Sequence, residues 1–268
     1  MMDCEVAISC LNDDLFKIEG NLENIFNLKG VFIHIVHQVN NNQDYSGFVD
    51  DFLNKIDNIR YSKLTEIGLP VSRNFALHNC KAKYLIPTDS DIIFFKDELL
   101  KVEKIFSEYP EADYITLKSY YDFEKKKPRK KFNSKVKFHN RRSLLSVSSI
   151  EIVLKVHSFQ KENVQWDQDF GLGARFGGGL ETVMLQSAHK ARLKGIFYPI
   201  PLCYHPDLSS GLQVSLKKVY IRSAVFEKIF GVFWGKFLSL VFHLKNYKDY
   251  KEFKIFDILK LILKNKYL

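Results

Sequence analysis

The chain has 268 residues, 46% of them hydrophobic and 26% charged, a composition that excludes a protein without a real hydrophobic core and fits one large or two small domains. The formal net charge of +9 is placed unevenly, since residues 216–268 hold 12 Lys and Arg against 4 Asp and Glu. The C-terminal segment is therefore expected to meet an anionic surface.

Strands and helices alternate along the first 120 residues. The patterns predict strands at 5–12, 30–38, 59–65, 83–95 and 113–120, and helices at 13–30, 48–56, 69–82 and 96–110. Gly30 and Pro110 are plausible helix stops. This alternation favours an α/β domain with a mostly parallel sheet.

The second half is more irregular. Residues 124–142 contain ten Lys and Arg and read as a loop, which either is a solvated segment or captures an anionic acceptor. Strands are predicted at 148–156 and 196–206, and a glycine-dense loop runs into a helix that begins near Leu180. From Ser215 on, two or three amphipathic helices follow. We expect one domain over 1–214, with halves 1–95 and 96–214, and a helical tail over 215–268.

Cysteines and apolar runs indicate the setting. Cys4, Cys10, Cys80 and Cys203 have neither metal-type spacing nor a paired pattern, which is simplest in a reduced, cytoplasmic protein. The N-terminal residues contain acids and no long apolar run, so no signal peptide is expected. The longest apolar run is interrupted by Lys236 and is too short to span a membrane.

The segment "AKYLIPTDSDIIFF", residues 82–95, ends a predicted buried strand with Asp89 and Asp91. In open α/β sheets, ligands bind beyond the carboxyl ends of the strands. If the strand continues through both residues, the two carboxylates point the same way and repel each other. A divalent cation such as Mg²⁺ or Mn²⁺ relieves that repulsion. The alternative is a solvated turn after the strand.

The context of this acidic pair resembles glycosyltransferase family 2, whose members have the GT-A fold. A G-x-x-x-[AS]-R-N segment precedes the helix that leads to the D-x-D strand in that family. The matching residues here are Gly68, Ser72, Arg73 and Asn74. The resemblance implies a nucleotide-diphospho-sugar transferase fold with a mostly parallel central sheet flanked by helices.

A second segment resembles the acceptor half of a bacterial subgroup that builds surface polysaccharides. That subgroup reads roughly D-E-x-F-G-L-G-x-x-F-x-x-G-E-E. The matches are Asp167, Phe170, Gly171, Leu172, Gly173, Phe176, Gly179 and Glu181. Gln168 and Leu180 replace two acids of the pattern, and the second replacement puts any role of that acid in doubt.

The resemblance implies roles for the donor side of the site. Asp91 would bind a metal that bridges the donor's diphosphate, and Asp89 would contact the ribose or the metal through water. His205 would bind the metal or the diphosphate, with a structural role as the alternative. The donor-binding candidates are Ser9, Asn12, Gln38, Arg73, Asp89 and Ser90. Gln38 stands where the family usually has an Asp that reads the base, and for Arg73 a structural salt bridge is the alternative.

Glu181 is the candidate general base, because an inverting transfer needs one carboxylate to take the proton of the attacking hydroxyl. It follows three glycines at a predicted helix start, where an acid also simply favours the helix dipole. Trp166 and Asp167 are candidate acceptor contacts. A core position for the tryptophan and a loop-stabilising role for the acid are the alternatives.

The tail mixes aromatic and aliphatic residues with regularly placed lysines. Such helices can lie in the membrane interface beside anionic headgroups, and packing on the domain is the alternative. The prediction is a peripheral protein at the inner face of the cell membrane.

The leading hypothesis is a metal-dependent, inverting hexosyl- or N-acetylhexosaminyltransferase. It would take a nucleotide-sugar donor, with a UDP-sugar as first choice, and a saccharide or lipid-linked acceptor. A sugar nucleotidyltransferase is disfavoured because the first strand is not followed by a Gly-rich phosphate loop. A basic, non-catalytic membrane or nucleic-acid binder is permitted by the charge, but the charge lies on amphipathic helices, so no nucleic-acid partner is expected.

Overall fold

The computed structural model describes residues 3–205, 215–250 and 253–264. A nine-stranded sheet forms the centre of the described chain, in the order β3-β2-β1-β4-β8-β6-β9-β5, with β7 paired to β9. The strands are β1 (Cys4–Leu11), β2 (Val31–Gln38), β3 (Ile59–Leu64), β4 (Tyr84–Asp89), β5 (Ile93–Phe94), β6 (Tyr114–Tyr120), β7 (Lys137–Phe138), β8 (Ile152–Lys155) and β9 (Gly195–Tyr204).

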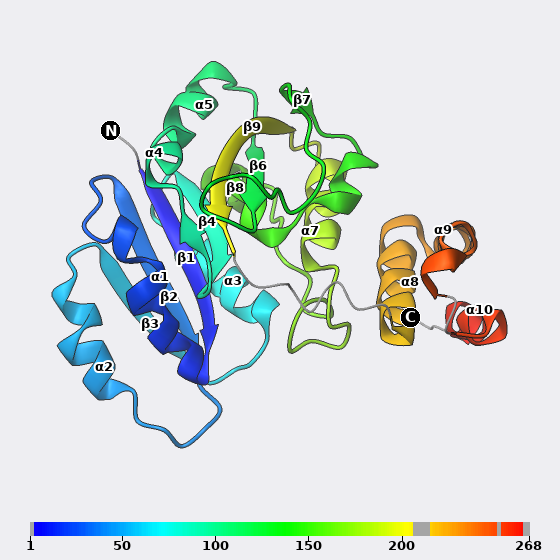
Figure 1. Ribbon diagram of the computed structural model, residues 1–268, viewed down its shortest axis with the longest axis horizontal. Coiled ribbons are helices and arrows are strands. Elements are labelled where there is room, and N and C mark those ends of the chain that lie inside the picture. The colour runs from blue at the N-terminus through cyan, green and yellow to red at the C-terminus, as the bar shows by residue number, and fades with distance from the viewer. Residues whose placement is uncertain (1–2, 206–214, 251–252, 265–268) are drawn as a thin grey trace.

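The helices lie on both faces of the sheet and beyond its far edge (Figure 1). They are α1 (Ile18–Asn21), α2 (Ser46–Asp51), α3 (Leu69–Asn79), α4 (Lys96–Leu99), α5 (Val102–Glu108), α6 (Val156–Lys161), α7 (Leu180–Lys190), α8 (Leu216–Phe230), α9 (Val232–Lys245) and α10 (Ile255–Lys264). Short 3-10 helices connect several of them, at 12–17, 23–25, 53–55, 143–146, 149–151 and 247–250.

The sheet is mostly parallel, as the alternation predicted. Parallel pairs join β1 to β2, β1 to β4, β2 to β3 and β6 to β9. The short strands β5, β7 and β8 pair in the antiparallel sense. Because β8 lies antiparallel between β4 and β6, the carboxyl ends of β1, β2, β4, β6 and β9 share one edge of the sheet.

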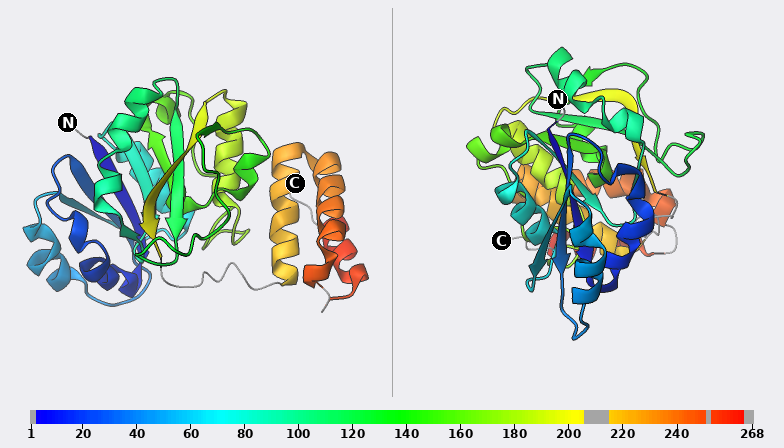
Figure 2. Two further views of the ribbon diagram at one scale, coloured as in Figure 1. Left: turned by 45° about the horizontal axis from the view of Figure 1, so that its top comes forward. Right: turned by 90° about the vertical axis from the view of Figure 1, so that its left-hand side faces the viewer.

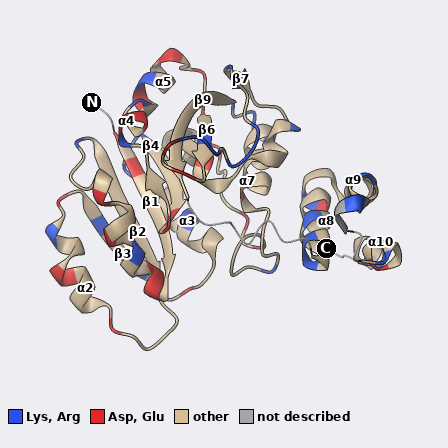
Figure 3. Cartoon of the chain, viewed as in Figure 1, with Lys and Arg blue, Asp and Glu red and all other residues tan. Residues whose placement is uncertain are grey.

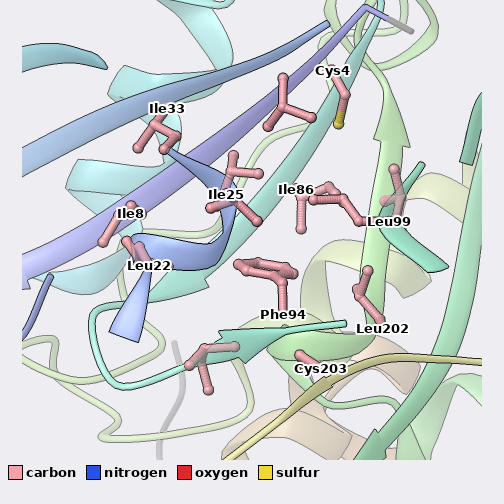
Figure 4. Close-up of a cluster of buried hydrophobic side chains, with 14 of the residues drawn as sticks. Cys4, Ile8, Leu22, Ile25, Ile33, Ile86, Phe94, Leu99, Leu202 and Cys203 are labelled. Carbon is pink, nitrogen blue, oxygen red and sulfur yellow. The ribbon is translucent and has the colours of Figure 1, made fainter. Parts of the chain in front are cut away.

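Alternation along the strands builds a hydrophobic layer on each face. On one face, Val6 and Ile8 of β1 join residues of α1, α4 and α5 in a cluster shown in Figure 4. On the other face, Ala7 of β1 and Leu85 of β4 pack with α3, α6 and α7. The period-2 pattern therefore fixes which side chains each helical layer covers.

Two long helices expected from the sequence are divided in the structure. The stretch 13–30 folds as a 3-10 helix, α1 and a second 3-10 turn. Five apolar residues have the helical spacing that predicts a helix here: Leu15, Ile18, Leu22 and Ile25 are buried, and Phe26 is partly buried. The stretch 96–110 forms α4 and α5. Burial thus follows the predicted pattern while the backbone adjusts its turns to fit the curved sheet.

The C-terminal helices extend the molecule away from the sheet (Figure 2). A Cβ at Gly179 would lie 2.3 Å from Val225 Cγ2, so α8 packs directly on the start of α7. Val219 of α8 packs with Ile258 and Ile262 of α10. The domain boundary expected at residue 214 falls within 206–214, outside the described residues.

All four cysteines are buried free thiols. Burial raises the pKa of the Cys80 thiol to about 12, so this thiol stays protonated at neutral pH.

Candidate active site

The candidate residues gather where the parallel strands end. Ser9 of β1 pairs with Asp89 of β4 in the ladder, and Leu11 of β1 pairs with Gln38 of β2. At the other half of the sheet, the backbone N–H of His205 donates to the Tyr120 carbonyl at 3.0 Å, just beyond β6 and β9. Residues from five strands therefore meet at one edge, as expected for an α/β ligand site.

The acidic pair does not lie on one continuous strand. β4 ends at Asp89, and Ser90 and Asp91 form a turn before β5. The condition under which the two carboxylates would point the same way is therefore not met, and they have different partners. Asp89 Oδ1 accepts from Arg73 at 3.1 Å, and Asp91 Oδ2 lies 3.3 Å from His205 Nε2.

Asp91 and His205 offer a set of atoms that suits a divalent cation. The hydrogen bond from His205 is the largest cause that lowers the pKa of Asp91, so this carboxylate is ionised at neutral pH. Its other oxygen, Oδ1, is buried and has no hydrogen-bond partner in the described part of the chain. An anionic, unpartnered oxygen beside an imidazole nitrogen fits Mn²⁺ or Mg²⁺.

A full protein cage for a metal is not present in residues 3–205, 215–250 and 253–264. No group of three or more His, Cys, Asp or Glu in these residues could hold an ion. A cation at Asp91 and His205 would thus need further ligands from water or from a bound phosphate, which is the usual arrangement for Mg²⁺.

Arg73 joins two candidate carboxylates that the sequence analysis treated separately. Its side chain is 1% exposed, and its guanidinium donates to Asp89 Oδ1 through one nitrogen and to Glu181 Oε1 through another. Glu181 is the second residue of α7, and Gly179 caps the start of this helix with a φ of +80°, in the left-handed region that favours glycine. The candidate base and the first acid of D-x-D are therefore held by one buried cation.

Asp89 experiences opposing influences at this point. Loss of water around the carboxylate raises its pKa, and the Arg73 cation acts in the opposite direction, with the raised pKa as the net result. The two acids therefore differ in their tendency to ionise: the pKa of Asp89 is raised, whereas the pKa of Asp91 is lowered.

Two predicted donor contacts, Ser9 and Asn12, also hold the loops at the strand ends. Ser9 Oγ accepts from Ser72 Oγ at 2.8 Å. Asn12 has a positive φ of 49° and exchanges two hydrogen bonds with Asn40, at 2.7 and 3.1 Å. Their part in donor binding stays a prediction.

Gln38 is buried, and its amide nitrogen donates to the carbonyls of Glu66 and Gly68 at 2.7 and 3.0 Å. Any reading of a base by Gln38 would therefore fall to its amide oxygen. Ser90 is buried too, and its carbonyl accepts from Asn21 at 3.0 Å.

The two predicted acceptor contacts lie in the loop before α7. Trp166 is 1% exposed in the second core cluster, and Asn74 holds its backbone through hydrogen bonds of 2.7 and 2.8 Å. No face of the ring is open to a sugar in this arrangement, so stacking would require the loop to move. Asp167 forms an ion pair with Lys228 of α8, with 2.6 Å between Asp167 Oδ2 and Lys228 Nζ.

Two contacts with these residues were not foreseen from the sequence. Lys228 belongs to the tail, where one lysine among many on amphipathic helices has no distinguishing signal. Arg129 belongs to the basic loop, and its guanidinium donates to the His205 carbonyl at 3.2 Å. The loop is thus attached to the strand end that carries His205, and Figure 3 shows its Lys and Arg in front of the sheet.

Comparisons with known proteins concern the family and the fold of the chain. A family model described as glycosyl transferase family 2 matches residues 8–159. A search of curated proteins gave no match.

Solved structures share the fold at low sequence identity. Residues 1–349 of S. aureus TarS match with 12% identity and a TM-score of 0.65, over 98% of this chain and 90% of that chain. TarS 1–349 in complex with UDP-GlcNAc matches with 14% identity and a TM-score of 0.65, over 99% and 76% of the two chains. The mannosyltransferase PcManGT from Pyrobaculum calidifontis, in complex with GDP-Man and Mn²⁺, matches with 12% identity and a TM-score of 0.61, over 98% and 86%. These likenesses confirm the predicted fold class.

Proposed function

The chain belongs to glycosyltransferase family 2, and we propose that it is an inverting, metal-dependent enzyme acting on a nucleotide-sugar and a growing surface polysaccharide or lipid-linked oligosaccharide. The observation that carries this proposal is the pair of contacts at one sheet edge: Asp91 beside His205, and Arg73 between Asp89 and Glu181.

A nucleotide-sugar is the proposed donor. The similar structures were solved with UDP-GlcNAc, UDP and GDP-Man, all nucleotides or nucleotide-sugars. We take a UDP-sugar as the first choice. Residues 1–95 would bind this donor, and residues 96–214 would contribute the acceptor side.

Asp91 and His205 would hold the divalent cation. When bound there, Mn²⁺ or Mg²⁺ supplies positive charge that stabilises the departing nucleoside diphosphate. The two residues suit a cation as they stand. The hydrogen bond from His205 keeps Asp91 ionised, and Asp91 Oδ1 has no protein donor within the described residues.

Glu181 would act as the general base on the acceptor hydroxyl. Removal of that proton makes the oxygen a better nucleophile toward the anomeric carbon, and attack opposite the leaving group inverts the configuration there. Arg73 would be a positioning residue: its fixed, planar guanidinium orients the Glu181 carboxylate.

The test compares Asp91→Asn and Glu181→Gln with Glu111→Gln, an exposed acid outside the site. Donor turnover with Mn²⁺ and a panel of UDP-, GDP- and dTDP-sugars should fall about 100-fold or more in the first two variants and stay unchanged in the third. NMR of the product should give the anomeric configuration opposite to that of the donor. Full activity in both site variants, or a retained configuration, would refute the mechanism.

The C-terminal helices support the proposed membrane contact. Exposed apolar side chains on α9 include Phe233 at 76%, and Phe256 and Leu263 of α10 are also exposed. Lysines are concentrated in the same segment, so an anionic bilayer surface complements it in both apolar character and charge. Within the described residues, no helix is long and apolar enough to cross a membrane. We propose peripheral binding at the inner face of the cell membrane.

Two phenylalanines give a matched test of this surface. Phe237 of α9 and Phe32 of β2 are both 51% exposed, but only the first lies on the tail. Phe237→Ser should weaken co-sedimentation with phosphatidylglycerol vesicles several-fold, whereas Phe32→Ser should not. Equal binding by both variants, or equal binding to neutral phosphatidylcholine vesicles, would rule out this role.

A further inference from the structure

A cavity lies in the half of the chain that follows residue 95, and most of its lining comes from the basic loop 124–142. Its volume is about 410 Å³, and it lies between the segment 130–133, β7 and the segment 139–147. Thr116 and Phe197 close it from the sheet, and Glu151 closes it from the 3-10 helix 149–151.

The cavity is bordered by positive charge that is not neutralised. Lys131, Lys137 and Arg142 line it, and none of them has an ion pair within the described residues. Glu151 is the acid among the lining residues, and it is 1% exposed. Lys130 pairs with it, so this carboxylate does not offset the other three cations.

The Glu151 carboxylate is bound within the wall of the cavity. It accepts from Ser119 Oγ at 2.9 Å and from the Ser148 backbone N–H at 3.1 Å, besides its pair with Lys130. Each of these contacts fixes the segment beside the cavity. The remaining cations therefore favour an anion in the space that they border.

The other lining groups suit a saccharide. Phe132 and Phe197 stack with ring centroids 6.0 Å apart, and Phe138 is exposed. Asn133, Asn140 and Ser143 line the same space. Aromatic faces with a few amides and hydroxyls can receive the apolar face and the hydroxyls of a sugar ring.

The cavity is joined to the candidate active site by short connections. Lys130 follows Arg129, whose side chain donates to the His205 carbonyl at 3.2 Å. The Arg129 backbone N–H donates to the Ser119 carbonyl at 3.1 Å, and Ser119 also donates to Glu151. Thr116 of the cavity and Tyr120 at the sheet edge are four residues apart on β6, or about 13 Å.

We propose that this cavity is an acceptor subsite that binds an acidic saccharide unit, bearing a carboxylate or a phosphate, away from the reacting hydroxyl. This proposal rests on the proposed function, because it takes the reaction to be glycosyl transfer. It adds that the acceptor is an acidic saccharide.

The test is direct binding without donor or metal, so its result is independent of catalysis. Ligand-observed saturation-transfer NMR would titrate tetragalacturonate, its neutral methyl ester and mannose 6-phosphate into the full-length protein. The variant carries Lys131→Gln, Lys137→Gln and Arg142→Gln. Its control carries Lys29→Gln, Lys81→Gln and Lys161→Gln, three exposed lysines elsewhere that remove the same charge.

The expected result is binding of at least one acidic sugar by the wild-type protein, about tenfold weaker binding by the cavity variant, and unchanged binding by the control. Equal weakening in both triple variants would reduce the effect to general charge and overturn the proposal. Binding of neither acid, or equal binding of the methyl ester, would also overturn it. If inorganic phosphate displaces the bound acidic sugar as effectively as the free sugar does, the cavity is a simple anion site and the proposal of a saccharide subsite is overturned. Loss of activity in Asp91→Asn and Glu181→Gln tests the proposed function separately.

Discussion

At the scale of single residues, Arg73 organises the candidate site, since it is buried and contacts carboxylates 16 and 108 residues away in the sequence. Buried guanidinium groups are retained where two directed hydrogen bonds are needed at once. Its removal would leave Asp89 and Glu181 without the cation that both contact, which affects the orientation of both carboxylates.

We therefore predict that Arg73→Gln lowers kcat by about 100-fold, and that Arg73→Lys recovers only part of the loss because an ammonium cannot bridge both carboxylates with a planar fork. Arg60→Gln is the matched control, because Arg60 also pairs with a buried acid, Glu5, at 3.1 Å but outside the site. It should lower the melting temperature and leave kcat unchanged. A kcat within threefold of wild type in Arg73→Gln would contradict the role.

The second residue-scale prediction concerns the metal. Asp91→Asn and His205→Gln should each raise the Mn²⁺ concentration needed for half-maximal activity by about tenfold or more, because each removes one of the two proposed protein ligands. Electron paramagnetic resonance of free Mn²⁺ in the presence of UDP should show the same weakening without turnover. Unchanged Mn²⁺ titrations in both variants would exclude this metal position.

Sequence patterns located the candidate residues better than their partners. Asp89, Asp91, Glu181 and His205 do meet at one sheet edge, as the order of motifs and strands implied. The bridge through Arg73 was not predictable, because a contact over 108 residues depends on how α3 and α7 pack. Trp166 shows the same limit, since a ring in a loop reads equally as a ligand platform or as core.

At the scale of elements, the start of α7 and the tail helix α8 depend on each other. Gly179 has a φ of +80°, and a Cβ there would lie 2.3 Å from Val225 Cγ2. Lys228 of α8 also pairs with Asp167 in the loop before α7. The helix that presents Glu181 is thus supported by the segment proposed to contact the membrane.

Gly179→Ala is expected to destabilise the fold by about 1–3 kcal/mol from backbone strain, with a further penalty from the clash with Val225. Adding Val225→Ala should remove the steric part and leave the strain. Urea unfolding of the two single variants and the double variant measures the coupling. Additive effects would show that α8 and α7 are energetically independent.

The elements themselves were predicted well where the pattern was strong. Strands such as 30–38 and 196–206 alternate or run apolar over their full length and appear within a residue or two of their predicted bounds. The stretch 13–30 was less predictable, because its apolar spacing indicates which side chains are buried but does not distinguish α-helical from 3-10 turns. Asn12, with its positive φ, already departs from regular strand geometry before that stretch.

At the scale of the whole molecule, three histidines with restricted access to water contribute to the response to acid. Burial lowers the pKa of His139 and of His243 from 6.5 to about 4, and lowers that of His37 as well. In the unfolded chain these groups bind protons near pH 6.5, whereas in the folded protein they stay neutral. Their contribution to stability is present above pH 6.5 and is lost as the pH falls toward about 4.

The melting temperature should therefore fall between pH 7 and pH 4.5, and His139→Gln should make that fall shallower. Glutamine can donate to and accept from Thr116 and Ser143, the groups now 2.7 and 3.0 Å from the His139 nitrogens. His157→Gln, a change at an exposed histidine of α6, serves as the control. Identical pH slopes in wild type and His139→Gln would show that this histidine is not involved.

Helices α8 and α9 of the tail cross at Gly235. A Cβ at Gly235 of α9 would lie 2.4 Å from Glu227 Cα of α8, so the two helix backbones approach as closely as a glycine permits. Any ancestor or descendant that keeps this crossing must keep a residue without a side chain there. Position 235 should thus work as a lineage marker: relatives with a bulkier residue at this place have either lost the helical hairpin or changed its crossing.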